Sequence, residues 1–285
     1  MPELEDVLCC PDCHGDLARA ADGATCAACA AVFPVVDEIA TFVAAAGRTG
    51  FKGRQAAWFD GGLDEELEIE RPLGTPRLYA WHYREKFRRG TSRLEALLPG
   101  ATALTVCGGS GMDAEFLARS GFGVVTADIS LGAARRARER AARHRFGLES
   151  IVADVERLPF RDAAFDLVYV HDGLHHLERP LDGLAEMARV ARRAIAVSEP
   201  AAAAVTSLAV RLGLALETEE AGNPVGRLAL CDVTGCLASR GFLVVDAHRY
   251  AMYFKHEPGR VMRTLSVPPL YWLVRAGISG FNRLA

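Results

Sequence analysis

The chain has 285 residues, half of them hydrophobic, so it is long enough to bury a core and to contain more than one unit. Its net charge of −3 gives no global sign of a nucleic-acid partner. The acidic stretch Met1 to Asp6 is unlike a basic secretory leader, and no apolar run reaches the roughly 18 residues of a membrane span. We therefore expect a cytoplasmic protein whose eight cysteines are thiols or metal ligands.

Four cysteines near the start form two pairs, Cys10-x2-Cys13 and Cys26-x2-Cys29, with twelve residues between the pairs. Each pair makes a tight turn that presents two sulfurs to one side, and two such turns complete a tetrahedral Zn²⁺ site. Cys9 is the spare thiol, because only Cys10 gives the two-residue spacing. Four thiolates leave no open coordination position, so the zinc is expected to be structural. Free thiols or disulfides are the alternative.

The segment around these cysteines is acidic. Residues 1–46 carry eight acidic side chains against the single Arg19, a balance of −7, which argues against a grip on RNA. A segment of this length cannot bury enough apolar surface to fold alone. We therefore expect the metal to hold it together. With Val32–Ile39 after the second pair, residues 7–43 resemble the small zinc-ribbon family that precedes or partners methyltransferases.

The next part of the chain is a predicted linker and a predicted helix. Residues 44–52 have linker composition, and an acidic run covers Asp64–Glu70. Tyr79–Leu98 is expected to be a basic helix with a solvated face. An RNA-binding patch and a lid over the active site are the alternatives, and in a lid Tyr79 or His82 would touch the ligand.

A glycine-rich turn organises the rest of the sequence. Leu104–Val106 predicts a strand, Cys107 to Gly111 a tight turn, and the residues from Met112 a helix. Glycines let the backbone approach a ligand closely, and the first amides of a helix point at it. Gly109-x-Gly111-x-x-Ala114 also fits the loose dinucleotide pattern, so the turn alone indicates only a nucleotide.

A second predicted strand, Val124–Asp128, ends in a carboxylate 19 residues after Gly109. An acid at that strand tip is placed to accept both hydroxyls of an adenosine ribose. Capping of the next helix by Asp128 or Ser130 is the alternative. That helix is expected to be solvated, because six arginines are distributed around it: Arg135, Arg136, Arg138, Arg140, Arg143 and Arg145.

The third strand region distinguishes between cofactors. Asp154 followed by Leu158-Pro159-Phe160, and then Phe165-Asp166-Leu167-Val168, is similar to class I S-adenosylmethionine-dependent methyltransferases of the small-molecule, type 11-like group. The resemblance covers about residues 100–248. It implies an α/β fold, with a doubly wound Rossmann-like sheet behind the small N-terminal zinc ribbon. It also implies S-adenosylmethionine as cofactor, with Asp154 and Val155 framing the adenine.

The family's pattern at this turn is acid-x-Gly-x-Gly-x-Gly, and this chain departs from it at two positions. Thr105 replaces the acid, and Cys107 replaces the first glycine. Asp113 is the candidate to hold the methionine amino group in place of that acid. Cys107 either crowds the methionine end or packs as a small hydrophobic group. The predicted cofactor contacts are Cys107, Gly108, Gly109, Gly111, Asp113, Asp128, Ile129, Asp154, Val155, His171, Asp172 and, from the lid, Tyr79.

A histidine-rich loop follows the fourth predicted strand, Phe165–Val170. Ligands of α/β sheets lie at the carboxyl ends of the strands, so this loop should face the transferred methyl group. His171, His175 and His176 are the candidate bases for an acceptor that must lose a proton. The alternative is packing, since the family commonly carries a His pair here. Metal binding by the three histidines is disfavoured, because no matching acid cluster is evident.

The C-terminal third is less regular. A helix over Leu181–Ala191 and a strand over Ala194–Ser198 precede an apolar insert, Ala201–Leu216. A helix near Val225–Ser239 follows, and Gly241–Val245 is expected to open the family's terminal hairpin. For the apolar tail, residues 261–285, core packing or an interface is expected, with a substrate wall or membrane-surface contact as weaker alternatives.

Together these patterns predict a zinc ribbon (1–46), a linker with a helical lid (47–98), and a class I methyltransferase domain (99–285) with an insert at about 200–222 and a helical tail. The expected function is methyl transfer from S-adenosylmethionine to a small, apolar acceptor. The alternatives are an rRNA or tRNA methyltransferase, a non-catalytic cofactor-binding partner protein, and an oxidoreductase. The oligomeric state is open, with a homodimer among the options.

Overall fold

The structure is a computed structural model, and it describes residues 4–20, 22–43, 49–97, 100–211, 217–219, 222–252 and 257–284. Its centre is a parallel five-stranded sheet in the order β7-β6-β5-β8-β9. The inner strands β5, β6 and β8 form because they are largely apolar runs buried on both faces. The bounds of the strands are β5 Thr102–Val106, β6 Gly123–Asp128, β7 Glu149–Val152, β8 Phe165–His171 and β9 Ala191–Ser198.

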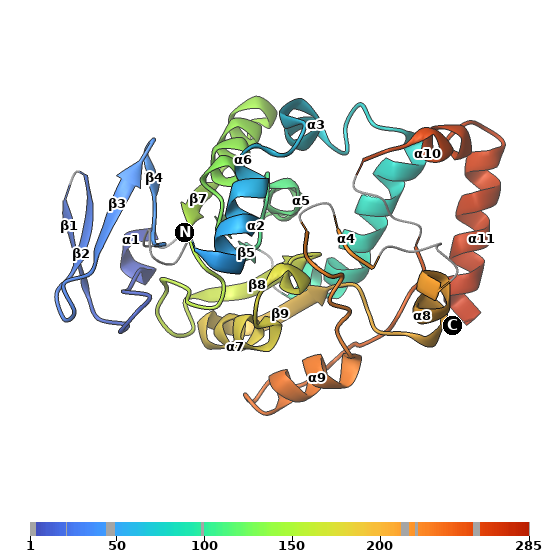
Figure 1. Ribbon diagram of the computed structural model, residues 1–285. Helices are drawn as coiled ribbons and strands as arrows, with labels where there is room; N and C mark the ends of the chain where they lie inside the picture. Colours follow the sequence, from blue (N-terminus) through green and yellow to red (C-terminus); the bar gives the residue numbers. More distant parts are fainter. Residues whose placement is uncertain are drawn as a thin grey trace.

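The two faces of the sheet are covered by different helices (Figure 1). Leu104 and Val168 point to the face packed by α7, Pro180–Val190. Tyr169 points to the other face, which is covered by α4, Arg77–Leu97, and α5, Met112–Arg119. Adjacent residues of a strand point to opposite faces, so one apolar run supplies both layers of the core.

The strand order reverses between β5 and β8, which lie side by side while the chain continues outward from each. Ligands of open α/β sheets bind at the carboxyl ends of the strands at such a switch point. The glycine turn that follows β5 and the histidine loop that follows β8 therefore meet at one edge. The predicted doubly wound sheet is confirmed, and its switch point lies at the predicted site.

Gly108 in the turn is fixed by a close approach of β6. A Cβ at this position would lie 2.0 Å from Thr126 Oγ1, a hydroxyl that already bonds Thr105 Oγ1 at 2.8 Å. Gly108→Ala is therefore expected to lower the free energy of unfolding by about 2–3 kcal/mol, measured by urea denaturation. Gly147→Ala, where a Cβ meets nothing within 4 Å, is the control and should be near neutral. Equal stability of the two variants would contradict this account.

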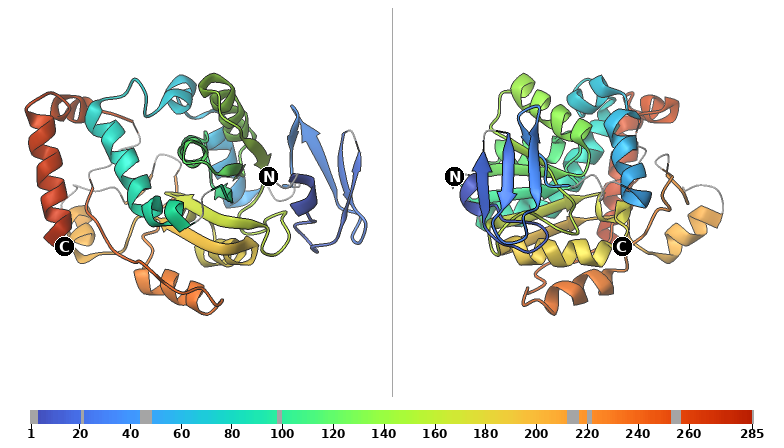
Figure 2. Two further views of the ribbon diagram at one scale, coloured as in Figure 1. Left: turned by 180° about the vertical axis from the view of Figure 1, so that it is seen from behind. Right: turned by 60° about the vertical axis from the view of Figure 1, so that its left-hand side comes forward.

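The N-terminal cysteines belong to a small antiparallel sheet of strands β1 to β4. This ribbon packs directly against the main domain, as Figure 2 shows from two sides. Leu8 pairs with Phe160, and the Phe42 amide donates to the Val152 carbonyl at 2.8 Å. The bounds are α1 Leu4–Val7, β1 Leu17–Ala20, β2 Gly23–Cys26, β3 Val32–Val36 and β4 Ile39–Ala40.

The acidic side chains of the ribbon face arginines of the main domain. Asp37 pairs with Arg135, and Glu38 with Arg138 at 2.7 Å. Two further pairs of the same kind are Asp12 with Arg157 at 3.3 Å and Asp16 with Arg161 at 2.7 Å. Much of the ribbon's net negative charge is thus paired with arginines of the same chain. Such exposed ion pairs orient the ribbon and add little stability.

The expectation of a solvated arginine helix is wrong in part for α6, Leu131–His144. Arg136 and Arg140 lie one turn apart on the same face and are almost completely buried. Arg136 donates to the Phe59 carbonyl at 2.6 Å, and Arg140 bonds Glu115 at 2.9 Å. The two buried guanidinium groups satisfy carbonyls at the ends of α2, Gly50–Gly61, and α3, Glu65–Glu70.

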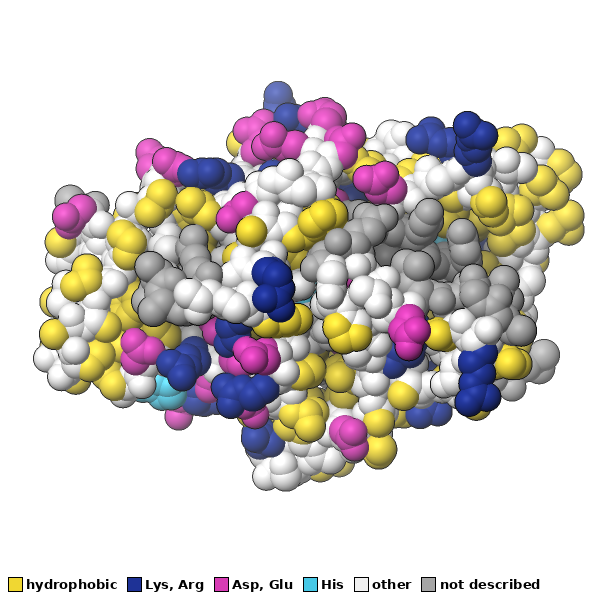
Figure 3. Space-filling view, viewed as in Figure 1, with side chains coloured by type: hydrophobic (Ala, Val, Ile, Leu, Met, Phe, Trp, Pro, Cys, Tyr) yellow, Lys and Arg dark blue, Asp and Glu magenta, His cyan; other side chains and the backbone are white. Residues whose placement is uncertain are grey.

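The remaining arginines of α6 follow the prediction more closely. Arg143 is partly exposed and pairs with Glu66 and Glu70 of α3, at 2.9 and 3.0 Å. Acidic and basic side chains accordingly gather over α3 and α6 in Figure 3. The arginines are spaced evenly along the sequence of α6. That spacing does not show which of them are buried and which pair at the surface.

The expected terminal hairpin does not form in the described residues. No strand covers Gly241–Val245, and Leu243 and Val245 are exposed. The alternating apolar residues therefore do not pack on a sheet edge in this structure. The C-terminal elements are α8 Ala204–Arg211, α9 Leu230–Ala238, α10 Arg260–Leu265 and α11 Leu270–Leu284. The hairpin's second strand would come from Tyr250–Lys255, of which residues 253–255 lie outside the described part of the chain, as do residues 212–216 of the insert.

The tail packs on α4 through only part of its apolar surface. Met262 and Tyr271 are buried with residues of α4, whereas Trp272, Leu273 and Phe281 are exposed. Figure 3 shows the resulting hydrophobic area over α10 and α11. No helix of the described residues is long and apolar enough to cross a membrane.

Candidate functional site

The glycine turn after β5 has the backbone shape that its sequence predicts. Gly109 and Gly111 take φ values of 51° and 77°, in the left-handed region, and Gly111 precedes the first turn of α5. Cys107, in place of the family's first glycine, takes a φ of 49°. Gly173 makes room for it, since a Cβ there would lie 2.4 Å from Cys107 Cβ. Burial raises the pKa of the Cys107 thiol, so Cys107 packs as a neutral group.

Asp128 lies at the tip of β6 and is oriented by two backbone amides. Its Oδ2 accepts from Gly109 N and its Oδ1 from Ser130 N, both at 2.9 Å. Ser130, and not Asp128, caps α6, because its hydroxyl accepts from Ala133 N at 2.9 Å. A carboxylate has about four acceptor positions, so each oxygen of Asp128 keeps capacity for another donor. The neighbouring Ile129 packs partly buried against Ala134 of α6.

Asp154 follows β7 and is engaged by a lysine from α2. Lys52 Nζ lies 2.5 Å from Asp154 Oδ2 and 2.9 Å from Glu156 Oε2. Burial lowers the pKa of Lys52, but the two carboxylates outweigh burial and raise it. The adjacent Val155 is buried in the main core. Lys52 therefore partly neutralises the carboxylate that was predicted to meet the adenine.

Helix α2 lies across the carboxyl ends of β6 and β7. Besides Lys52, its Asp60 accepts from Gly132 N at 2.8 Å and from Ser130 Oγ at 2.7 Å. Its Gln55 contacts His176 at 3.1 Å. The segment between the ribbon and the main sheet thus covers the predicted site. The covering helix is chiefly α2, and less so α4, which contains Tyr79.

Tyr79 and His82 lie on α4, behind the site. Tyr79 is almost fully buried, and its hydroxyl lies 3.3 Å from that of Tyr83. Tyr83 is the residue whose ring meets His171, with centroids 6.1 Å apart. His82 is buried, and burial lowers its pKa to about 4. The α4 side chain that reaches the carboxyl edge is Lys86, which pairs with Asp172.

His171, at the end of β8, lies between two carboxylates. Its Nδ1 is 3.1 Å from both oxygens of Asp113, and its Nε2 is 3.4 Å from Asp172 Oδ2. Burial and the charge of Lys86 lower the pKa of His171, but the two carboxylates outweigh both and raise it to about 9. Asp113, the candidate for the methionine amino group, is thus already paired with His171. The raised pKa favours the protonated imidazole at neutral pH, in which Nδ1 donates to Asp113.

This pairing predicts a pH dependence of stability. The folded-state pKa lies above the usual value near 6.5, so protonated His171 stabilises the fold below about pH 6.5, and this is lost as pH rises through about 9. Lys86, Tyr83 and Tyr169 are the other titratable groups around it. The stability gap between wild type and His171→Gln should shrink by up to about 3 kcal/mol over this range, measured by urea unfolding. A gap independent of pH would contradict the pairing.

His175 and His176 form a second group in the same loop. His175 Nδ1 lies 2.8 Å from Glu199 Oε2, and its Nε2 lies 3.2 Å from Glu219 Oε1. His176 Nε2 lies 3.2 Å from the other oxygen of Glu219. The premise that no acid accompanies these histidines is therefore wrong. It failed because Glu219 comes from the insert, 44 residues from His175.

The remaining side chain that shapes this loop is Glu199, at the end of β9. Its Oε1 accepts from Gly173 N at 2.7 Å and from Leu174 N at 2.8 Å. The sequence carried a signal for it, since an acid that directly follows a strand lies at the carboxyl edge of a parallel sheet. Lys52 and Lys86 carried none, because each is one of several basic residues in a helical segment.

The four ribbon cysteines converge as predicted. Cys10 Sγ lies 3.6 Å from Cys29 Sγ, and Cys13 Sγ lies 3.4 Å from Cys26 Sγ. The amides of Cys29 and Ala28 point at the Cys26 sulfur and lower the pKa of its thiol to about 6. Cys9 is buried apart from this group, and its amide donates to the Pro159 carbonyl. The thiols present the donor set of a closed tetrahedral zinc site.

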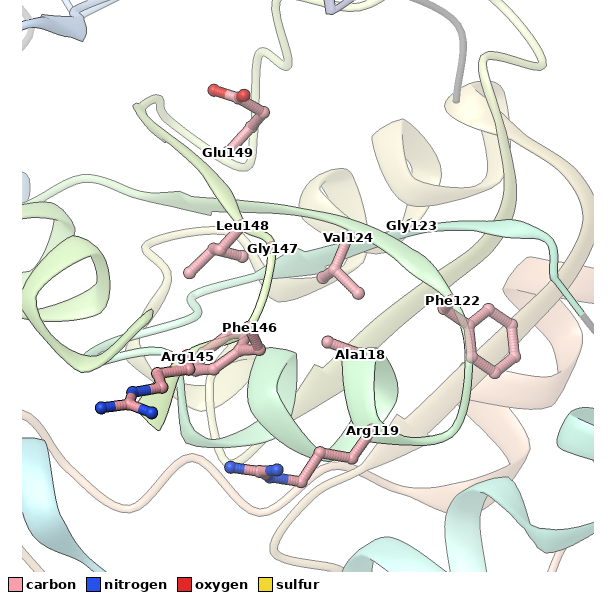
Figure 4. A pocket seen from close by; sticks show the side chains of 10 residues that line it. All are labelled: Ala118, Arg119, Phe122, Gly123, Val124, Arg145, Phe146, Gly147, Leu148 and Glu149. Carbon is pink, nitrogen blue, oxygen red and sulfur yellow. The ribbon is translucent and has the colours of Figure 1, made fainter. Parts of the chain in front are cut away.

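A surface hollow of about 460 Å³ lies at the opposite edge of the sheet, between the end of α5 and the start of β6 (Figure 4). Arg119 and Arg145 flank it, and apolar residues such as Phe122 and Phe146 form its walls. This is the amino-terminal edge of the sheet, where α/β folds do not bind their ligands. The chemistry-bearing residues gather at the other edge.

Comparison with known proteins agrees with this arrangement. Residues 104–194 match the family described as "Methyltransferase domain". Over these residues the chain is similar to methyltransferase domains. The magnesium protoporphyrin IX methyltransferase of Synechocystis PCC 6803, solved with bound SAH, superposes on 72% of this chain and 94% of its own length, with a TM-score of 0.53 and 20% identity. That likeness shows the fold.

The methyltransferase domain also has relatives in sequence. It is 42% identical over 106 residues to a demethylmenaquinone methyltransferase of Corynebacterium urealyticum, covering 37% of this chain and 44% of that protein. It is 35% identical over 120 residues to the enzyme of the same name from Beutenbergia cavernae, covering 42% and 45%. The chain thus spans less than half the length of these relatives.

The residues of the methyltransferase domain fit an adenosyl cofactor. Open space lies beside the turn, since a Cβ on Gly109 would meet nothing within 4 Å. Asp128, held by the Gly109 amide, borders the same turn. An oriented carboxylate beside a free glycine backbone matches the needs of a ribose and of the chain attached to it.

Proposed function

We propose that the protein transfers a methyl group from S-adenosylmethionine to a small, largely apolar acceptor in the cytoplasm. The observation that supports this most is the meeting of the glycine turn, Asp128 and Asp154 at the switch-point edge of the sheet. In this proposal Asp128 binds the ribose and Asp154 the adenine. The glycine turn, from Cys107 to Gly111, lies along the methionine part of the cofactor.

For the methionine end, the geometry favours a composite site. Asp113 is paired with His171, so it would bind the amino group only while keeping or exchanging that partner. Asp172 and Lys86 lie beside them and offer both signs of charge to a zwitterionic amino acid group. We propose that Asp113, His171 and Asp172 bind this end together. The acceptor then lies against the loop that contains His175 and His176.

The proposed acceptor class rests on the relatives. The proteins with 35–42% identity are named for a demethylated menaquinone, which is a small apolar molecule. The segments that build acceptor pockets, namely the insert and the covering helices, fall mainly outside the matched region of residues 104–194. For this chain we therefore propose the class, a small apolar molecule with an activatable carbon, oxygen or nitrogen, and no single compound.

The experiment is a binding measurement followed by a transfer measurement. Calorimetric titration should show that S-adenosylmethionine and S-adenosylhomocysteine bind, while NADH does not compete. Incubation with methyl-labelled S-adenosylmethionine and a panel of reduced quinones and phenols should then move label into an organic extract. Binding without transfer to any small molecule would favour the non-catalytic partner protein, and absence of binding would refute the proposal.

An RNA methyltransferase is the second candidate, and the ribbon argues against it. Its acidic residues Asp12, Asp16, Asp37 and Glu38 face arginines of the main domain. Those arginines are thereby less available to phosphates. Filter binding with structured RNA at low and high salt tests this candidate, because real phosphate contacts give a steep salt dependence. We further propose that the ribbon holds a structural Zn²⁺.

A further inference from the structure

The insert that interrupts the methyltransferase domain places a carboxylate opposite two histidines. Glu219 meets His175 Nε2 with one oxygen and His176 Nε2 with the other, each at 3.2 Å. One donor atom from each of the three residues lies within 4.8 Å of the other two. Both histidine side chains and Glu219 are largely buried, with 2%, 19% and 27% of their surface exposed.

The far sides of the two imidazoles are held by acceptors from other elements. His175 Nδ1 lies 2.8 Å from Glu199, which directly follows β9, and His176 Nδ1 lies 3.1 Å from Gln55 Oε1 of α2. Metal-binding histidines characteristically donate their second ring N–H to a carboxylate or carbonyl oxygen, which fixes the tautomer and orients the ring. Here both rings are oriented in that way, with both Nε2 atoms directed at the same carboxylate.

Glu219 is itself oriented. Asn223, which has no exposed surface, donates from Nδ2 to Glu219 Oε2 at 3.3 Å. The Glu219 amide also donates to the Asn223 carbonyl at 2.9 Å. The insert therefore holds this carboxylate over the histidine loop in a defined position.

In one tautomer the arrangement suits a cation among these three groups. If Gln55 accepts from His176 Nδ1–H, the lone pair on His176 Nε2 faces a carboxylate oxygen of Glu219. Two lone pairs at this distance repel unless a proton or a metal ion lies between them. Donor atoms around a tetrahedral ion with bonds of about 2.1 Å lie about 3.4 Å apart. Each imidazole Nε2 lies 3.2 Å from its own oxygen of the Glu219 carboxylate, which is close to that value.

We propose that His175 Nε2, His176 Nε2 and the Glu219 carboxylate bind a divalent transition-metal ion such as Zn²⁺, separate from the four-cysteine site. Two imidazoles and one carboxylate are a known ligand set for zinc, and three protein ligands leave a position open. The open position accepts water or an oxygen of a bound molecule. Because the site lies at the carboxyl ends of β8 and β9, that molecule would lie at the cofactor edge of the sheet.

Metal content of the full chain tests this assignment without any acceptor or cofactor, and so independently of the proposed reaction. After exchange with excess Zn²⁺ and gel filtration, wild type should hold two zinc ions per chain. His176→Ala and Glu219→Gln should each hold one, and Glu217→Gln, an exposed neighbour, should still hold two. A wild type with one zinc, or a His176→Ala protein with two, would overturn the assignment.

Cobalt substitution distinguishes the two sites by their ligands. Co²⁺ at four thiolates gives intense sulfur-to-metal charge-transfer absorption, whereas Co²⁺ at nitrogen and oxygen ligands gives only weaker d–d bands. Titration of the metal-free wild-type chain should fill both sites, and Glu219→Gln should lose only the weaker component. Because Glu219→Gln keeps the size and position of the side chain, it preserves the fold. Identical cobalt spectra of wild type and Glu219→Gln would refute the site.

Discussion

S-adenosylmethionine is expected to raise the Tm of the wild-type protein, and Asp128→Ala is expected to abolish that rise. The carboxylate lies at the tip of β6 and is oriented by the amides of Gly109 and Ser130. Hydrogen bonds to a charged group contribute about 1.5–3 kcal/mol each, so loss of both ribose contacts should weaken binding by more than about 100-fold. Isothermal titration with S-adenosylhomocysteine measures the change directly.

This variant also removes an acceptor from two backbone amides, so its effect on the fold needs a separate measurement. Asp128→Asn keeps an oxygen for one of these amides and should retain more of the unliganded stability, but it should still bind the cofactor weakly. Glu149→Ala, an exposed acid at the start of the neighbouring strand β7, is the matched control and should bind normally. Unchanged affinity in Asp128→Asn and Asp128→Ala, each titrated well below its own Tm, would refute the ribose assignment.

The sequence predicts the sheet and its turn well because local patterns determine them. The strands are apolar runs, and the turn needs glycine at Gly108 for space and at Gly111 for backbone conformation. Both cysteine pairs follow from spacing alone, and the four thiols meet. The position of Asp128 at the carboxyl end of β6 is predicted for the same reason, and its role as a ribose ligand stays a prediction.

The sequence could not predict side chains that approach from distant segments. Lys52 meets Asp154 across 102 positions, and Glu219 meets His175 across 44. Arg140 was expected to be solvated and is completely buried, because nothing local distinguishes it from the exposed arginines of the same helix. The hairpin expected from Gly241 does not form in the described residues, although β9 ends the sheet and offers an edge, so the local apolar pattern did not predict the pairing. Patterns within one helix or strand therefore predict that helix or strand. They do not predict which side chains from distant segments it will contact.

The ribbon and the loop that contains Asp154 share a hydrophobic core, which would give the proposed zinc a role beyond the ribbon itself. Cys10, Cys26 and Phe33 pack in one cluster with Leu158 and Phe160 of the main domain. The main chain joins the two parts as well, through the Cys9 amide to the Pro159 carbonyl at 3.0 Å. The loop from Asp154 to Phe160 therefore has the ribbon as one of its walls.

Loss of this zinc is expected to lower both stability and cofactor affinity. Cys26→Ser should reduce Tm by at least about 10 °C, because structural zinc contributes its binding free energy to folding. It should also weaken binding of S-adenosylhomocysteine severalfold, since the loop that contains Asp154 loses its support. Differential scanning calorimetry and isothermal titration measure the two effects.

Two comparisons make this result specific to the four-cysteine site. Cys231→Ser changes an exposed cysteine elsewhere and should alter neither quantity. Cys26→Ser is more selective than a chelator, because a chelator would also remove an ion held by His175 and His176. A lower Tm with unchanged cofactor affinity would mean that the ribbon stabilises the chain without supporting the Asp154 loop. An unchanged Tm would mean that no structural metal is bound, because the packing around Cys26 would then be sufficient without one.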